Sequence, residues 1–160
     1  MNSLVGKQVA EEGGKKSPCT YEVTSCNVAI ERVDIRVWDS PGLQDDTGKD
    51  EEYLAEIERK VTEELDLVIF CVNMDDTRLN RDKETFKILT KQFGKDLWKN
   101  AVMALTFANK VEDQDGGDRK AYFMQELANW REAIHSFLND TLKLDPKLVQ
   151  SLPLVPTGYY

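Results

Sequence analysis

The sequence predicts an α/β fold in which strands and helices alternate along the chain. Apolar residues occupy every second position in two neighbouring segments, 21–31 and 32–39, as expected of half-buried strands. Residues 67–72 and 101–105 are instead continuous apolar runs, the pattern of strands covered on both faces in a parallel sheet. Segments with helical character separate these runs, and that alternation is typical of a sheet with helices packed against it.

The first two strands are joined so closely that we expect an antiparallel pair. Helices are expected over residues 51–64, 81–93 and 119–142, and residues 152–156 are a candidate for a last strand. In the longest helix, apolar residues recur at intervals of three and four, a stripe that packs on a sheet. The stripe consists of Phe123, Leu127, Trp130, Ile134 and Leu138.

Composition limits the class of protein. A chain of 160 residues with 41% hydrophobic residues can fill one core, so we expect residues 1–160 to form a single domain. The net charge of −8 repels phosphate backbones and no basic patch offsets it, so nucleic acid is not an expected partner. The three cysteines form no CxxC pattern and no secretory signal opens the chain, so we expect a cytoplasmic location. The apolar runs are far shorter than the roughly 20 residues of a membrane-spanning helix.

The second predicted strand ends in Asp-Ser-Pro-Gly at residues 39–42. An aspartate at the carboxyl end of a strand can reach a magnesium ion through water, and a glycine three residues later can bring its N–H close to a γ-phosphate. Asp39 and Gly42 therefore match the DxxG element of a GTPase. Turn chemistry alone would permit the same four residues, but the strand pair before them and the helix and apolar strand after them favour the GTPase interpretation.

The amino terminus resembles a second G-domain element. Residues 2–6, Asn-Ser-Leu-Val-Gly, are similar to the sequence that closes the first helix in many G domains, a few residues after the phosphate loop. This resemblance implies that the first strand and the phosphate loop are absent from these 160 residues. Residues 13–17, Gly-Gly-Lys-Lys-Ser, lack the GxxxxGK(S/T) spacing and the flanking strand and helix of such a loop. We interpret them as part of switch I.

Further residues resemble the AIG-type (immunity-associated) and chloroplast-import-receptor branch of the GTPase superfamily. Arg78-Leu79, Phe93-Gly94 and Trp98 match the Arg-Leu/Phe, Phe-Gly and Trp positions of that branch, and the resemblance covers nearly the whole chain. It implies the three-layer α/β G-domain fold of the P-loop NTPase superfamily. The sheet would be mostly parallel with one antiparallel edge strand, and would lack the first strand and the phosphate loop.

The guanine-reading motif should fall within residues 106–112, where two registers stay open. Asn109, Lys110 and Glu112 resemble the common NKxD motif with glutamate replacing aspartate. Residues from Thr106 to Asn109 instead resemble the Thr-starting variant of the AIG and import-receptor group. In both registers a side-chain oxygen must accept from the N1–H and N2–H₂ donors of guanine. Asn109 belongs to both, whereas the longer Glu112 would fit the base less well than aspartate.

Two more positions complete the expected site. Thr157 and Gly158 follow the last predicted strand, where the fifth G-domain motif places a backbone amide near the base. Thr20 is best placed in switch I, by its distance from Asp39, to contact magnesium and γ-phosphate. Thr24 is the second candidate, and either threonine could serve only as a β-branched strand residue.

The resemblance implies a GTP-binding, GTPase-like protein that uses GTP or GDP with Mg²⁺. It also implies dimerisation with a second copy or a related G domain through the switch face. Without a phosphate loop the triphosphate loses its main electrostatic partner, so we expect the chain alone to bind nucleotide weakly or not at all. Enzymatic activity is therefore left open. The alternative is a non-catalytic, G-like interaction module.

Overall fold

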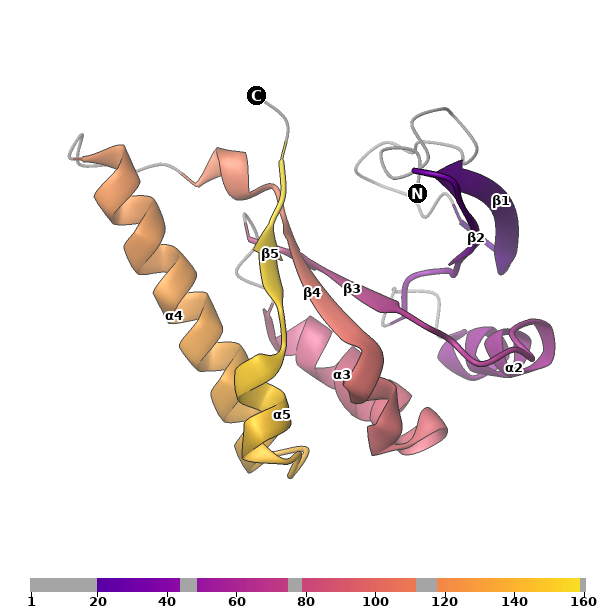
Figure 1. Cartoon of the computed structure of the whole chain (residues 1–160). Helices are drawn as coiled ribbons and strands as arrows, with labels where there is room; N and C mark the ends of the chain where they lie inside the picture. The colour runs from indigo at the N-terminus through magenta and orange to yellow at the C-terminus, as the bar shows by residue number, and fades with distance from the viewer. Residues whose placement is uncertain (1–19, 44–48, 75–78, 112–117, 159–160) are drawn as a thin grey trace. The chain divides into compact units, whose positions relative to one another are not determined.

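The computed structural model describes residues 20–43, 49–74, 79–111 and 118–158. The chain divides into two compact units, Met1–Glu64 and Leu65–Tyr160, which are described separately (Figure 1). The expectation of one domain over residues 1–160 stays a prediction.

The first unit contains the expected antiparallel pair. Strands β1 (Thr24–Ile30) and β2 (Val33–Asp39) pair from Thr24 opposite Asp39 to Ile30 opposite Val33. The connection is a two-residue turn, Glu31 and Arg32, whose φ angles of 48° and 72° match the twist of a tight hairpin. The antiparallel pairing predicted from the short connection is therefore confirmed.

Helix α2 (Asp50–Lys60) follows in the same unit. Its first turn is acidic and its last turn carries Arg59 and Lys60, so both ends complement the helix dipole. The prediction that this helix continues to residue 64 is wrong. Val61 leaves the helical region with φ −92° and ψ 83°, and its N–H makes the last helical hydrogen bond to Ile57.

The second unit is built on a parallel sheet in the order β3 (Val68–Asn73), β4 (Ala101–Thr106) and β5 (Leu154–Pro156). These are the strands expected from the apolar runs and from the last candidate segment. The helical elements between and after them are α3 (Leu79–Phe93), η1 (Lys95–Asn100), η2 (Ala108–Lys110), α4 (Arg119–Asp140) and α5 (Pro146–Ser151).

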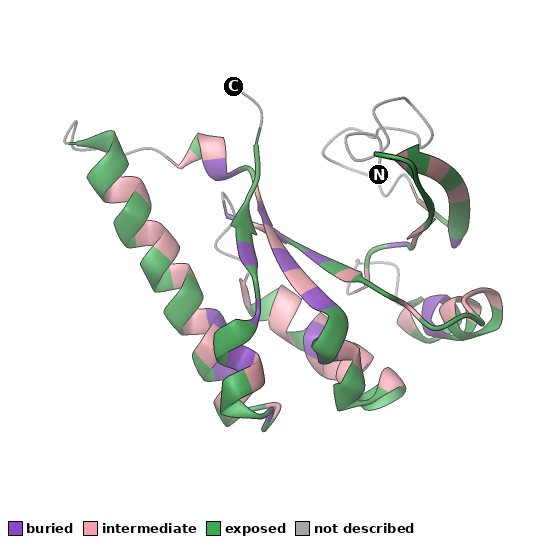
Figure 2. Ribbon diagram, viewed as in Figure 1, coloured by how far each residue is buried: buried purple, intermediate pink, exposed green. Residues whose placement is uncertain are grey.

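One face of this sheet forms the core of the second unit. Its side chains, such as Met103 and Leu105, are fully buried with residues of α3, α4 and α5 in a single apolar cluster (Figure 2). Trp98 stacks on Phe70 with ring centroids 4.7 Å apart and donates from Nε1 to Thr90 Oγ1 at 2.8 Å. The apolar stripe predicted for the longest helix lies against this cluster, buried in its carboxyl-terminal half and partly buried before it.

The opposite face of the sheet differs from the expectation of cover on both faces. Leu67 is 53% exposed, Ile69 42% and Val155 44%, and Val102 is half-buried. The physical reason is that α3, α4 and α5 all contribute to the cluster on the first face. Within the described ranges, β3 therefore carries apolar side chains on both faces, but only one face is buried.

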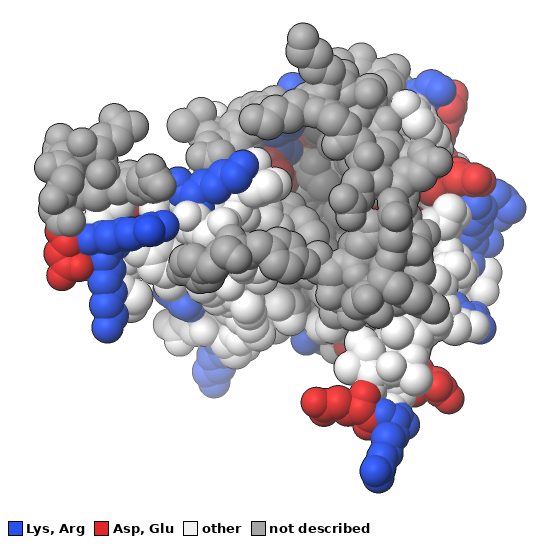
Figure 3. Space-filling view, turned by 90° about the horizontal axis from the view of Figure 1, so that it is seen from above, with Lys and Arg blue, Asp and Glu red and all other residues white. Residues whose placement is uncertain are grey.

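Two further properties concern the surface. On the face shown in Figure 3, acidic and basic side chains of the described residues lie interspersed, without a continuous patch of either sign. None of the helices in the described ranges combines the length and the apolar character that crossing a bilayer requires.

Candidate nucleotide-binding site

In the first unit, the hairpin brings Asp39 together with both candidate threonines. Asp39 is the last residue of β2, and Thr24 is its direct partner across the ladder. Thr20 lies before β1, and its Oγ1 donates to Asp39 Oδ2 at 3.5 Å. A hydroxyl and a carboxylate oxygen are ligands that Mg²⁺ prefers. This pair therefore fits a magnesium site shared by the ends of the two segments.

Gly42 lies three residues beyond Asp39, in the segment that follows β2. It is exposed, and a Cβ built on it would meet no atom within 4 Å. Packing does not require glycine here, so its predicted role in admitting a γ-phosphate stays a prediction. Among the described residues, no group of three or more histidine, cysteine or acidic side chains could hold a metal. A metal at Asp39 would have to complete its shell with water or phosphate oxygens.

In the second unit, backbone hydrogen bonds join the segment after β5 to the end of β4 and the segment that follows it. Thr157 N donates to Leu105 O at 2.8 Å, and Ala108 N donates to Thr157 O at 3.0 Å. The predicted base-reading segment and the predicted fifth motif therefore lie side by side at the carboxyl ends of two neighbouring parallel strands, where such sheets bind nucleotides.

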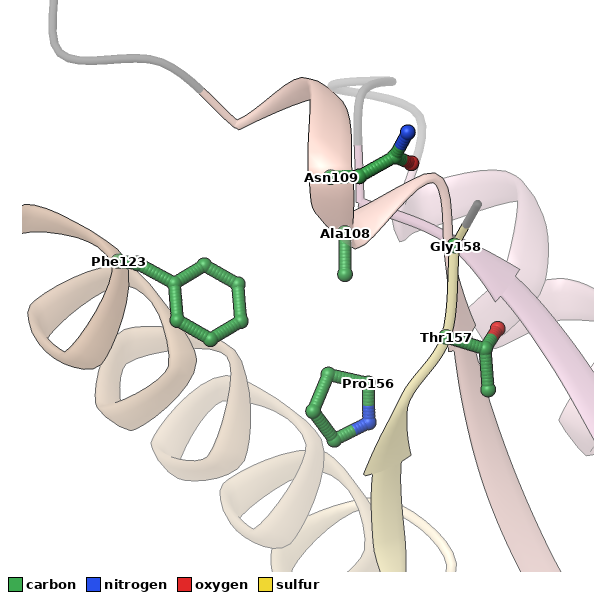
Figure 4. A pocket seen from close by; sticks show the side chains of 6 residues that line it. All are labelled: Ala108, Asn109, Phe123, Pro156, Thr157 and Gly158. Carbon is green, nitrogen blue, oxygen red and sulfur yellow. The ribbon is translucent and has the colours of Figure 1, made fainter. Parts of the chain in front are cut away.

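Gly158 lies so close to Asn109 that a side chain at position 158 would collide with it. A Cβ at position 158 would lie 2.3 Å from Asn109 Oδ1, a separation that real Cβ atoms do not show. Glycine is therefore needed at position 158 if Asn109 is to keep its place. Figure 4 shows the carboxamide of Asn109 directed to the side of Gly158.

A small pocket of about 190 Å³ lies beside this contact. Figure 4 shows Phe123, Ala108 and Pro156 converging on it from α4, η2 and β5. Its volume is below the roughly 300–1,000 Å³ of complete small-molecule sites. Ala108, Phe123 and Pro156 give the pocket apolar walls, and Asn109, Thr157 and Gly158 complete its lining.

The other predicted residues of this unit have definite partners. Thr106 Oγ1 donates to Val72 O at 3.2 Å, so its hydroxyl proton is bound to β3. Lys110 Nζ lies 4.5 Å from the centre of the Phe107 ring, a cation–π contact. Glu112 falls outside the described residues. The two registers for base reading therefore stay open.

Two phenylalanines have features that the sequence did not predict. Phe107 is 45% exposed and has φ 56°, a left-handed conformation that bulky residues rarely adopt. Phe123 belongs to the predicted helix stripe and packs on the core, and it also lines the pocket. Its place in the first turns of α4, ahead of the buried half of the helix, was the available signal.

Comparison with solved structures confirms the predicted α/β G-domain fold. The chain is similar to Toc33 from Arabidopsis thaliana in complex with GDP and Mg²⁺, with a TM-score of 0.77 and 19% identity, over 97% of this chain and 62% of that chain. It is also similar to Era in complex with MgGDPNP and nucleotides of 16S ribosomal RNA, with a TM-score of 0.60 and 18% identity, over 97% of this chain and 44% of that one.

Comparison of sequences gives the family. The Translocase of chloroplast 34 homolog, chloroplastic, of Chlamydomonas reinhardtii is 25% identical over 172 residues, which cover 99% of this chain and 43% of that protein. The chain thus spans less than half the length of this relative. The model of the AIG1 family matches residues 1–144, in agreement with the resemblance drawn from the individual motifs. The chain belongs to the AIG1 family.

Proposed function

We propose that this chain is the guanine-nucleotide-binding part of a GTPase-like protein. The observation that carries the proposal is the approach of Asn109 to Gly158 beside a small pocket at the carboxyl ends of β4 and β5. An amide side chain and a backbone that admits no Cβ are suited to the polar edge of a base held between apolar walls. The similar Toc33 structure is a complex with GDP and Mg²⁺, which supports the same ligand class here.

We assign the metal to the other unit. Thr20 and Asp39 would supply oxygen ligands for Mg²⁺, and the 3.5 Å between Thr20 Oγ1 and Asp39 Oδ2 supports a shared ion. When bound, the ion would neutralise phosphate charge. The roles of these side chains are to hold that ion and to orient the phosphates.

We also infer that the isolated chain binds nucleotide weakly. The 160 residues contain no GxxxxGK(S/T) sequence, so the amide nest and lysine that usually cradle the phosphates are not supplied by them. Binding would then lack its main electrostatic contribution, and we expect it to be weak. Turnover of GTP should be negligible for the same reason.

A titration followed by nuclear magnetic resonance tests this proposal, because the method detects weak binding. GDP with Mg²⁺ should shift the amide signals of Asn109 and Gly158, whereas ADP should shift them several-fold less. Asp39→Ala should remove the Mg²⁺-dependent part of GDP binding, and Asn109→Ala should remove the preference over ADP. Equal affinities of the wild-type chain for GDP and ADP would overturn the guanine assignment.

The same titration separates the two registers. If Glu112 reads the base, Glu112→Asp should tighten GDP binding and Glu112→Ala should remove the preference over ADP. If the Thr106 to Asn109 register reads the base, both changes should be nearly silent. The expected difference is about tenfold in affinity, because a lost pair of hydrogen bonds to a base edge costs about 1–3 kcal/mol.

Dimerisation through the switch face is the remaining part of the proposal. One similar solved structure concerns the chloroplast translocon components atToc33 and psToc159, for whose GTPase activity dimerisation is important. A second copy of this chain, or a related G domain, would meet the surface around Thr20 and Asp39. Sedimentation with a GTP analogue and with GDP tests this, and an unchanged monomer in both states would contradict it.

A further inference from the structure

Two side chains of helix α2 form hydrogen bonds with the main chain just before β1, at Val23. The N–H of Val23 donates to Glu56 Oε2 at 3.2 Å, and Lys60 Nζ donates to the carbonyl of Val23 at 2.6 Å. Glu56 and Lys60 are one helical turn apart and pair with each other at 2.8 Å. Val23 is only 2% exposed. One ion pair of α2 therefore satisfies both backbone groups of a buried residue, which would be costly to leave without partners.

This contact lies where the sheet no longer fixes the chain. The ladder between β1 and β2 begins with Thr24 opposite Asp39, so Val23 is one residue outside it. Thr20 lies three residues further back and reaches Asp39 through its hydroxyl. The path of the chain from Thr24 to Thr20 is therefore set at Val23, by side chains of a helix that begins eleven residues after Asp39.

We propose that Glu56 and Lys60 are positioning residues that hold Thr20 beside Asp39 through the main chain of Val23. This inference rests on the proposed function, since it concerns the metal site assigned to Thr20 and Asp39. It makes α2 the element that adjusts this site. A movement of α2 would release Val23 and with it the Thr20 hydroxyl, which would help to hold the metal.

The charge state of the pair agrees with this role. The hydrogen bond from Lys60 lowers the pKa of Glu56, and the hydrogen bond to Glu56 raises the pKa of Lys60. Both groups are thus ionised across the neutral range, and both bonds to Val23 are charge-assisted, the stronger class of hydrogen bond. Lys60 also lies 3.4 Å from Glu22, which adds a second contact to the same segment.

Hydrogen exchange in the whole chain, without any ligand, tests whether Glu56 and Lys60 hold the main chain of Val23. Glu56→Met and Lys60→Met should each make the Val23 amide exchange about tenfold faster or more, because a charged partner is lost. Glu52→Met is a matched control on the same helix, because Glu52 is exposed, and it should leave this amide unchanged. Unaltered exchange at Val23 in Glu56→Met, with helix content preserved, would overturn the inference.

A charge swap distinguishes hydrogen bonding to the main chain of Val23 from an ion pair that stabilises α2 alone. Glu56→Lys combined with Lys60→Glu keeps opposite charges one turn apart, but it sets a donor against the N–H of Val23 and an acceptor against its carbonyl. If the pair only stabilises α2, the swap should restore wild-type exchange at Val23. If the pair holds the main chain, exchange should stay as fast as in the single variants.

Binding of Mn²⁺ in the presence of GDP, measured by electron paramagnetic resonance, tests the link to the metal site. We expect Glu56→Met to weaken Mn²⁺ binding by about tenfold, in step with the loss of protection at Val23. If the wild-type chain binds Mn²⁺ and GDP and Glu56→Met binds both equally well, only the positioning role is overturned. If the wild-type chain binds neither, the proposed function fails, and the role at the metal site fails with it.

Discussion

An alanine at position 158 tests whether the approach of Gly158 to Asn109 serves recognition rather than folding. The added Cβ would lie 2.3 Å from Asn109 Oδ1 and 3.0 Å from Asn109 N. The first contact involves the end of a side chain that can turn away, at about 0.5–1.5 kcal/mol for a strained rotamer. Alanine also restricts the unfolded chain, which stabilises a protein by about 0.4–1 kcal/mol. These effects nearly cancel, so the free energy of unfolding should change by less than about 1 kcal/mol.

The effect of this substitution on binding should be larger. A displaced Asn109 amide can no longer meet the base edge, and the ratio of GDP to ADP affinity should fall roughly tenfold or more. Urea unfolding and the nucleotide titration measure the two quantities on one preparation. Gly42→Ala is the control for unfolding, because no atom lies within 4 Å of a Cβ built there. In an Asn109→Ala background, Gly158→Ala should not change the ratio further. A Gly158→Ala chain that keeps its wild-type ratio would refute the reasoning.

Three other predictions concern stability. Trp98→Ala should cost about 3–5 kcal/mol in urea unfolding, because the ring is fully buried against Phe70; a loss below about 1 kcal/mol would contradict this role. Asp118→Ala should cost about 1 kcal/mol and reduce helicity in circular dichroism, because Asp118 accepts from two backbone N–H groups at the start of α4; unchanged unfolding would show that this cap contributes nothing. Because Lys60 lowers the pKa of Glu56 from its ordinary 4.5, the stabilising effect of their pair is present at neutral pH and is lost as pH falls through the lowered pKa. The difference in stability between wild type and Glu56→Met should therefore close below pH 4.5, and a difference that persists in acid would contradict the ionic origin.

The sequence was sufficient for the strands and the long helices because their apolar periods are regular. It was insufficient for α5, whose six residues are too few to show a period. The signal was local instead. Asp145 caps the helix by accepting from the N–H of Lys147 at 2.8 Å, and Pro146 occupies the first turn, where its missing N–H costs nothing. The exposed face of β3 could not be predicted either, since an apolar run does not reveal which helices will cover it.

At the candidate site, the motifs predicted which residues follow the strands but not how they meet. The pairing of Thr20 with Asp39 and the contact of Asn109 with Gly158 depend on strand register and on backbone hydrogen bonds between distant segments. No sequence motif indicated that Glu56 and Lys60 of α2 would form hydrogen bonds with Val23. Glu56 and Lys60 look in the sequence like one more i, i+4 ion pair on a charged helix.

The uncovered face of the parallel sheet has a consequence for the behaviour of the chain in solution. Leu67 and Ile69, at β3, and Val155, on β5, are exposed apolar side chains on either side of β4, on a molecule that carries a net charge of −8. Mutual repulsion keeps such molecules apart at low ionic strength, whereas salt shortens the reach of that repulsion to within about 10 Å at 0.1 M. The same sheet should therefore make the chain bind hydrophobic dyes and self-associate as salt is added, the opposite of an assembly held by ion pairs. Purification in low salt follows directly from the geometry of β3 and β5.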